Sequence, residues 1–224
     1  MRKMKKLIGV LLLAIAPLLL QAQTSWRDSL AVLNRQIKLS PRSTDLRLKK
    51  AAVNIELGQW EYAIEEYGRV LDIDPKSPAA LYFRAYAHTH LRHLDLARRD
   101  YETLLSFLPR HFEARLGLAM VKRQLGRQQD TMDELNLLVQ QHPDSALAYA
   151  ARAGYEVERE LYGPALYDWD EALRRQPLNA DFVVSKTDVL LRMKRNDEAW
   201  ATLQEAMSKG VPRAALKEWI DKCK

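Results

Sequence analysis

The sequence has almost no cysteine and little glycine. Cys223 is the only cysteine among the 224 residues, so an internal disulfide is impossible and the fold must be held by packing alone. The 8 glycines form no glycine-rich phosphate loop, and the sequence contains neither a GxSxG elbow nor an HExxH metal-binding helix. We therefore expect a protein that is not an enzyme and holds no cofactor.

The sequence also lacks a basic run beyond its first few residues. Arg2, Lys3, Lys5 and Lys6 carry four of the positive charges, and the formal net charge of +6 falls to +2 without them. The remaining charges of both signs are interleaved along the chain. We therefore expect no nucleic-acid partner, because binding a polyanion requires a concentrated positive patch.

The N-terminal segment has the three-part organisation of a secretory signal peptide. A positive stretch over 2–6 is followed by an apolar stretch over 7–20 and by small or polar residues at 21–23. The apolar stretch spans 14 residues, short of the roughly 20 that a membrane-crossing helix needs, which disfavours the alternative of an uncleaved anchor. We predict a signal peptide over 1–22, export to the periplasm or cell surface of a bacterium, and no stable membrane insertion after cleavage.

A period of 34 residues organises the rest of the chain. It is marked by Pro41, Pro75, Pro109, Pro143 and Pro177. Small residues keep the same phase twenty-four positions before each marker, at Ala51, Ala85, Ala119, Ala153 and Thr187. They recur twelve positions before it, at Ala63, Ala97, Thr131, Ala165 and Ala199. Small positions in fixed phase indicate one packing unit, repeated along the chain.

Each unit reads as two helices with apolar residues at three- and four-residue spacing. The first helices are predicted at 44–57, 78–91, 112–125, 146–160 and 180–193, and the second helices at 60–73, 94–107, 128–141, 164–175 and 196–209. Each marker proline ends a second helix, and Gly58 and Gly126 end first helices in a left-handed conformation. Ser77, Ser145 and Asn179 are the expected N-caps.

The sequence at these positions resembles the tetratricopeptide repeat. Residues 58–67 (GQWEYAIEEY) and 71–75 (LDIDP) are similar to the second half of that repeat, and 97–109 and 165–177 match it more loosely. The resemblance implies an all-α fold, a right-handed α-solenoid of helix-turn-helix repeats with capping helices at both ends.

The expected solenoid covers 23–224. It divides into an N-terminal half-repeat at 24–43, repeats at 44–77, 78–111, 112–145, 146–179 and 180–213, and a C-terminal capping helix at 214–224. In the last segment, Leu216, Trp219 and Ile220 are spaced to cover the final repeat. Solenoid ends need such caps, because an unstacked apolar face would otherwise meet water.

Oppositely charged residues keep the same phase in several repeats. Lys50 and Glu66, Arg84 and Asp100, and Arg152 and Asp168 stand at equivalent positions of the two helices. We predict Arg84–Asp100 and Arg152–Asp168 ion pairs within 5 Å, with the arginine stems packed on apolar surface.

The resemblance also implies a partner-binding groove, because first helices line the concave face in this family. Carried over, it predicts binding stripes formed by Tyr82, Tyr86, His90, Leu116, Met120 and Arg123. Val184, Asp188 and Leu191 continue the pattern two helices later. Aromatic, methionine and arginine side chains are enriched in protein interfaces. The alternative is that these side chains only pack against neighbouring helices.

Three functions remain open. The leading hypothesis is an exported scaffold that binds a protein or peptide partner of unknown identity. The second is a self-associating structural or assembly protein of the cell envelope, so a homo-oligomer is an open alternative. The least favoured is a metal carrier using His88, His90 and His93, since the sequence places no cysteine or carboxylate nearby to complete a tetrahedral site.

Overall fold

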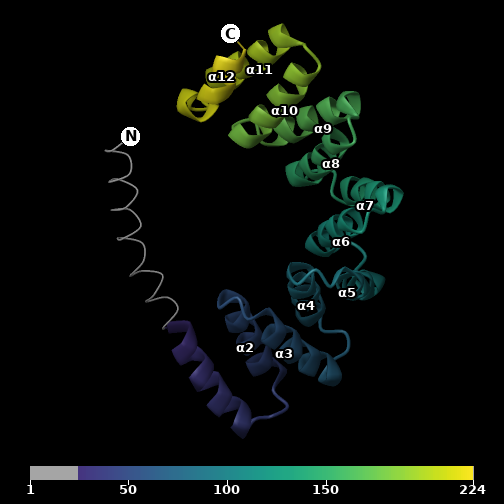
Figure 1. Cartoon of the computed structure of the whole chain (residues 1–224), viewed down its shortest axis with the longest axis vertical. Coiled ribbons are helices and arrows are strands. Elements are labelled where there is room, and N and C mark those ends of the chain that lie inside the picture. The colour runs from purple at the N-terminus through teal and green to yellow at the C-terminus, as the bar shows by residue number, and fades with distance from the viewer. Residues whose placement is uncertain (1–24, 224) are drawn as a thin grey trace. The chain divides into compact units, whose positions relative to one another are not determined.

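The protein is seen in a computed structural model that describes residues 25–223. All regular secondary structure in this part of the chain is helical (Figure 1). The chain divides into two compact units, one ending at Pro109 and the other beginning at Arg110. The predicted signal peptide over 1–22 lies outside the described residues.

The first unit contains a helix over 25–39 and two helical hairpins. Its labelled helices are α2 (Thr44–Glu56), α3 (Trp60–Ile73), α4 (Pro78–His90) and α5 (Leu94–Phe107). Helices α2 and α3 pack as a pair, as do α4 and α5, and α3 also packs against α4. Each hairpin therefore covers its neighbour's apolar face, as the predicted repeats require.

The second unit contains three further hairpins and a C-terminal cap. Its helices are α6 (Phe112–Gln124), α7 (Gln128–Gln141), α8 (Ala146–Glu158), α9 (Tyr162–Arg175), α10 (Ala180–Arg192), α11 (Asn196–Lys209) and α12 (Lys217–Lys222). Successive helices from α6 to α11 pack against one another, and α12 contacts α10 and α11.

The predicted helix boundaries are confirmed to within two residues, with one exception at the C-terminus. The C-terminal capping segment, expected as one helix over 214–224, instead begins with a 3₁₀ turn (Arg213–Leu216) that precedes α12. The Ala215 amide donates to the Pro212 carbonyl at 3.0 Å, an i→i+3 bond of the kind that often tightens a first helical turn. Leu216 and Ile220 are nonetheless buried against the last repeat, as the capping role requires.

The small residues of the 34-residue period lie where the two helices of a repeat cross. Ala51, Ala85, Ala97 and Ala119 have 0% exposure. Thr131 takes the place of an alanine and is also fully buried, with its hydroxyl donating to the Arg127 carbonyl at 2.8 Å. The hydroxyl is therefore satisfied within its own helix, which lets threonine occupy a site of close helix approach.

Two of the three predicted N-caps are confirmed. Ser145 accepts a hydrogen bond from the Ala148 amide, and Asn179 accepts bonds from Asp181 and Phe182. Ser77 occupies the cap position of α4, but its side chain makes no capping bond. Pro78 follows it at the first helical position, where a missing amide hydrogen leaves one fewer donor to satisfy.

The turn inside each hairpin requires one residue in the left-handed conformation. Gly58 (φ 68°) and Gly126 (φ 72°) fill this position in two repeats, as predicted. Arg92, Glu160 and Lys194 fill it in the others, with φ between 59° and 61°. The turn geometry is therefore kept even where a side chain must adopt a disfavoured backbone conformation.

Replacing Gly126 by alanine should lower the free energy of unfolding by roughly 1–2 kcal/mol, the cost of placing an L-residue in the left-handed region. A Cβ atom there meets nothing within 4 Å, so the backbone alone sets the effect. Urea unfolding followed by circular dichroism measures it. The matched control is Gly154→Ala, inside α8, which should stabilise by about 0.5–1 kcal/mol. Equal losses at both sites would contradict the interpretation.

Candidate functional site

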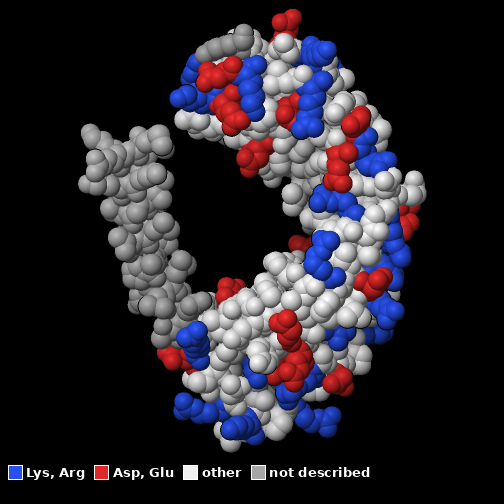
Figure 2. Space-filling model, in the orientation of Figure 1, with Lys and Arg blue, Asp and Glu red and all other residues white. Residues whose placement is uncertain are grey.

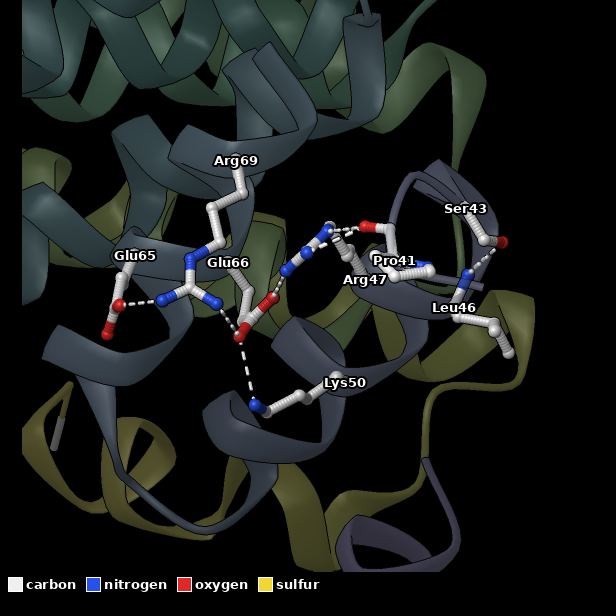
Figure 3. Close-up of polar contacts among 8 residues, drawn as sticks. All are labelled: Pro41, Ser43, Leu46, Arg47, Lys50, Glu65, Glu66 and Arg69. Atoms are coloured by element: carbon white, nitrogen blue, oxygen red, sulfur yellow. Dashed lines mark hydrogen bonds and ion pairs between the residues drawn. The ribbon is translucent and has the colours of Figure 1, made fainter. Parts of the chain in front are cut away.

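A buried carboxylate joins the two helices of the first repeat. Glu66, on α3, is 3% exposed and accepts from Arg47 at 2.8 Å and from Lys50 at 2.9 Å (Figure 3). Arg47 also donates to the Pro41 carbonyl at 2.7 Å. Burial alone would raise the pKa of Glu66, but the bonds from Lys50 and Arg47 hold it below its ordinary value. The carboxylate therefore ties α2, α3 and the preceding turn together.

Both predicted ion pairs are confirmed. Arg84 meets Asp100 through two hydrogen bonds of 2.6 and 2.8 Å, and Arg152 meets Asp168 through two of the same lengths. The carboxylates are 6% and 1% exposed, while the arginine side chains stay partly accessible. These are paired two-point contacts, the geometry in which arginine binds carboxylates most strongly.

The third repeat contains an ion pair that was not predicted. Arg115 donates to Glu134 at 2.5 Å, and Lys122 reaches the other carboxylate oxygen at 2.8 Å. Arg115 stands three residues before the position that holds Arg84 and Arg152, and Arg47 stands at the same earlier position in the first repeat. The sequence interpretation considered only the position of Arg84 and Arg152, which holds Leu118 in the third repeat, and so missed the Arg115–Glu134 pair. The sequence pattern that could have predicted this pair is an arginine near the start of the first helix together with a glutamate in the second helix, which occurs in the first and third repeats.

A second buried polar position lies one turn further along the first helices of the first, second and fourth repeats. Asn54, His88 and Glu156 occupy it at 2%, 8% and 7% exposure. Each has a buried polar atom without a hydrogen-bond partner among the described residues. Burial lowers the pKa of His88. Burial and, to a smaller extent, the nearby Asp168 carboxylate together raise the pKa of Glu156 to about 7. The repeats thus enclose polar groups beside their ion pairs.

Replacing Arg84 by leucine should lower the free energy of unfolding by roughly 3–5 kcal/mol, because Asp100 would stay buried without its cation. Leucine fits this position, since Leu118 occupies it in the third repeat. The double variant Arg84→Leu/Asp100→Leu should lose less free energy of unfolding than the single variant, because it leaves no unpaired charge in the interior. Urea unfolding measures both. Lys49→Leu, which removes an exposed pair with Asp45, is the control and should change stability by less than about 1 kcal/mol.

Glu156 should make stability depend on pH. Its pKa of about 7 lies above the ordinary value of 4.5, so between these pH values the folded state keeps a proton that the unfolded state loses. The free energy of unfolding should therefore fall as pH rises from about 4.5 to 7, by up to roughly 3 kcal/mol. Glu156→Gln should remove this slope and raise stability at pH 8, as measured by urea unfolding at several pH values. Glu158→Gln, at an exposed site on the same helix, should leave the slope unchanged.

In the first unit, the predicted binding residues form part of an aromatic cluster. Tyr86 is 37% exposed, and its ring packs edge-on against the exposed His90, with the ring centroids 4.6 Å apart. His90 stacks on Trp60 of α3 at 4.1 Å, so Trp60 belongs to the same surface although the sequence interpretation missed it. Tyr82 is half-buried and packs against Phe83 at 5.0 Å. Thus Tyr86 and His90 lie together at the surface, while Tyr82 serves packing more.

In the second unit, the predicted residues divide in the same way. Leu116 and Met120 are partly buried against the apolar core, in agreement with the packing alternative. Arg123 is exposed and pairs with Glu158 of α8 at 3.2 Å. Beside the later stripe, α8, α10 and α12 line a pocket of about 390 Å³ that includes Val184 and Asp188.

The histidine cluster does not converge. His88 is buried and lies 5.7 Å from the His93 ring, whereas His90 is stacked on Trp60. Among residues 25–223, no group of three or more His, Cys, Asp or Glu side chains is placed to hold a metal ion. Over the same residues, no helix is both long enough and apolar enough to cross a bilayer.

Two family models match this chain. A model described as TPR repeat matches residues 53–90, and one described as tetratricopeptide repeat matches residues 84–146. The matched segments contain α3 to α7, with the buried Ala85, Ala97 and Ala119. Residues 53–146 of the chain therefore carry tetratricopeptide repeats, as the sequence resemblance implies.

Solved structures show the same fold at low sequence identity. A tetratricopeptide repeat protein from Parabacteroides merdae matches with a TM-score of 0.63 at 21% identity, over 91% of this chain and 79% of that one. Pseudomonas aeruginosa pilF matches with a TM-score of 0.66 at 14% identity, over 92% and 96%. YrrB, described as a TPR protein with an unusual peptide-binding site, matches with a TM-score of 0.60 at 14% identity, over 83% and 96%. The fold is therefore an all-α tetratricopeptide solenoid.

A curated protein matches part of the chain. Human peptidyl-prolyl cis-trans isomerase FKBP4 is 25% identical over 118 residues, which cover 51% of this chain and 26% of that protein. The mouse protein of the same name matches at 25% over 120 residues, or 52% and 26%. This chain thus spans about a quarter of the length of these relatives.

Proposed function

We propose that this protein is an exported tetratricopeptide scaffold that binds a protein or peptide partner on the exposed faces of its first helices. The observation that carries the proposal is the surface cluster of Trp60, Tyr86 and His90. Aromatic side chains at a surface supply large contact area at low entropic cost, and they dominate many protein interfaces. Tetratricopeptide repeats bind protein or peptide partners as a class, and YrrB is a similar fold described with a peptide-binding site.

Two further features support a binding scaffold rather than an enzyme or a polyanion carrier. The conspicuous buried charges, such as Glu66 and Asp168, are used in ion pairs that join helices. In Figure 2, positive and negative side chains are interspersed over the visible face. Export rests on the signal-peptide pattern of residues 1–22.

Self-association is the second candidate function. Several large apolar side chains are exposed outside the aromatic cluster, including Tyr62 and Tyr167 at 62% each. Tyr62 lies on α3, two residues after Trp60 and so on a different face of that helix, because residues i and i+2 of a helix do not face each other. Tyr167 lies on α9, which holds no residue of the proposed site. A homo-oligomer through these faces would leave the first-helix surfaces free.

Site-specific photo-crosslinking tests the proposal directly. A photoreactive phenylalanine in place of Tyr86 should capture a protein other than this chain in the cell-envelope fraction, while the same residue in place of Tyr167 should capture none. Tyr86→Ala should then weaken the affinity for the purified captured protein at least about tenfold, as expected for an interface hot spot, and Tyr167→Ala should have less than a twofold effect. Products containing only this chain would favour self-association, and fractionation with the cytoplasm would contradict export.

A further inference from the structure

The pocket of the second unit is built from the cap as well as from the repeats. Gly154 and Val157 of α8 and Val184 of α10 line it, and Trp169 of α9 contributes a ring that is 7% exposed. Trp219 of α12 is half-buried and also lines the pocket. The pocket's volume of about 390 Å³ lies in the range of known small-ligand sites.

Gly154 leaves part of this pocket open without a structural reason of its own. It lies inside α8, where glycine costs about 0.5–1 kcal/mol relative to alanine. It is not among the residues with positive φ, and a Cβ atom at this position would meet nothing within 4 Å. Neither the backbone conformation nor close packing therefore requires glycine here. Its effect is to keep space free between α8 and the neighbouring pocket residues.

The charges beside the pocket already have partners. Asp188 accepts from Arg192 at 2.7 Å, and both residues line the pocket. Lys222 lies over the Trp219 ring at 3.8 Å and pairs with Glu218 at 2.7 Å. A charged ligand group would have to compete with one of these pairs, whereas an uncharged apolar group would not. The lining combines Ser185 and the Asp188–Arg192 pair with Val157, Val184 and two tryptophan rings, so an uncharged apolar side chain can pack on the apolar part without displacing a charge.

From these observations we propose that the pocket between α8, α10 and α12 receives one large uncharged apolar side chain, such as leucine, methionine or phenylalanine, from a peptide segment of the partner. The inference rests on the proposed function, because α8 and α10 are themselves first helices, and the exposed faces of first helices are assigned to partner binding. It adds the chemistry of the anchoring residue and gives Trp219 of the cap a role in recognition.

The pocket can be probed without knowing the partner. The probes are N-acetyl-leucine amide and N-acetyl-phenylalanine amide, compared with the lysine and glutamate analogues at the same millimolar concentrations. Protein labelled with ¹⁵N reports through its five tryptophan indole signals, which single Trp→Phe variants assign. The apolar probes should shift the Trp219 and Trp169 signals in a saturable way, at least about fivefold more than the charged probes do. Trp26 and Trp200, which do not line this pocket, should stay unshifted.

Filling the pocket provides the matched variant. Gly154→Leu should reduce the shifts from the apolar probes at least about fivefold. Gly163→Leu, at an exposed helical glycine of α9 that also has no atom within 4 Å of its Cβ position, should leave them unchanged. Shifts that are equal for all four probes, or that persist in Gly154→Leu, would overturn the inference. Crosslinking at Tyr86 would be unaffected by that result, so failure of the pocket and failure of partner binding are distinguishable.

Discussion

The close crossing of two helices at a small side chain is the constraint on which the rest of this structure depends. At each crossing an alanine, or a threonine bonded back to its own helix, lets the backbones approach and bury the larger side chains beside them. With a lone cysteine, the chain has no internal disulfide to compensate for a poorly packed crossing. Helix length and the turn inside each hairpin are the same from repeat to repeat, and a proline follows the second helix. Together they place the small residue at the helix crossing of every repeat.

The buried ion pairs add specificity to that packing. An apolar crossing by itself would tolerate a helix that slides or rotates by a fraction of a turn. A carboxylate such as Asp168, 1% exposed and held by two bonds from Arg152, does not tolerate it, since moving either partner would leave a charge in the interior. The first four repeats each contain such a pair across the two helices. The pairs therefore fix the register between helices, while the apolar contacts supply most of the stability.

The sequence was sufficient to predict the fold because its signals repeat. Proline spacing and alanine phase gave the helix boundaries to within two residues, and Arg84–Asp100 and Arg152–Asp168 followed from charges in phase. Features that occur only once along the chain were harder to predict from the sequence. Trp60 joins the surface cluster only because α3 brings it against His90, and Gly154 matters only because it lines the same pocket as residues of α10 and α12. Burial of Glu156 was also beyond prediction, since a glutamate in a helix is usually exposed.

The ion pairs have a consequence for how the repeats can be rearranged. In the first and third repeats a glutamate is held by an arginine near the start of the first helix, whereas in the second and fourth an aspartate is held by an arginine almost one turn later. A second helix with aspartate, transplanted into the third repeat, would face Leu118 at the position where its own repeat has Arg84 or Arg152. Exchanged between the second and fourth repeats, it would face an arginine at the matching position. For recombination or engineering, the interchangeable module is thus a tandem of two hairpins rather than a single one.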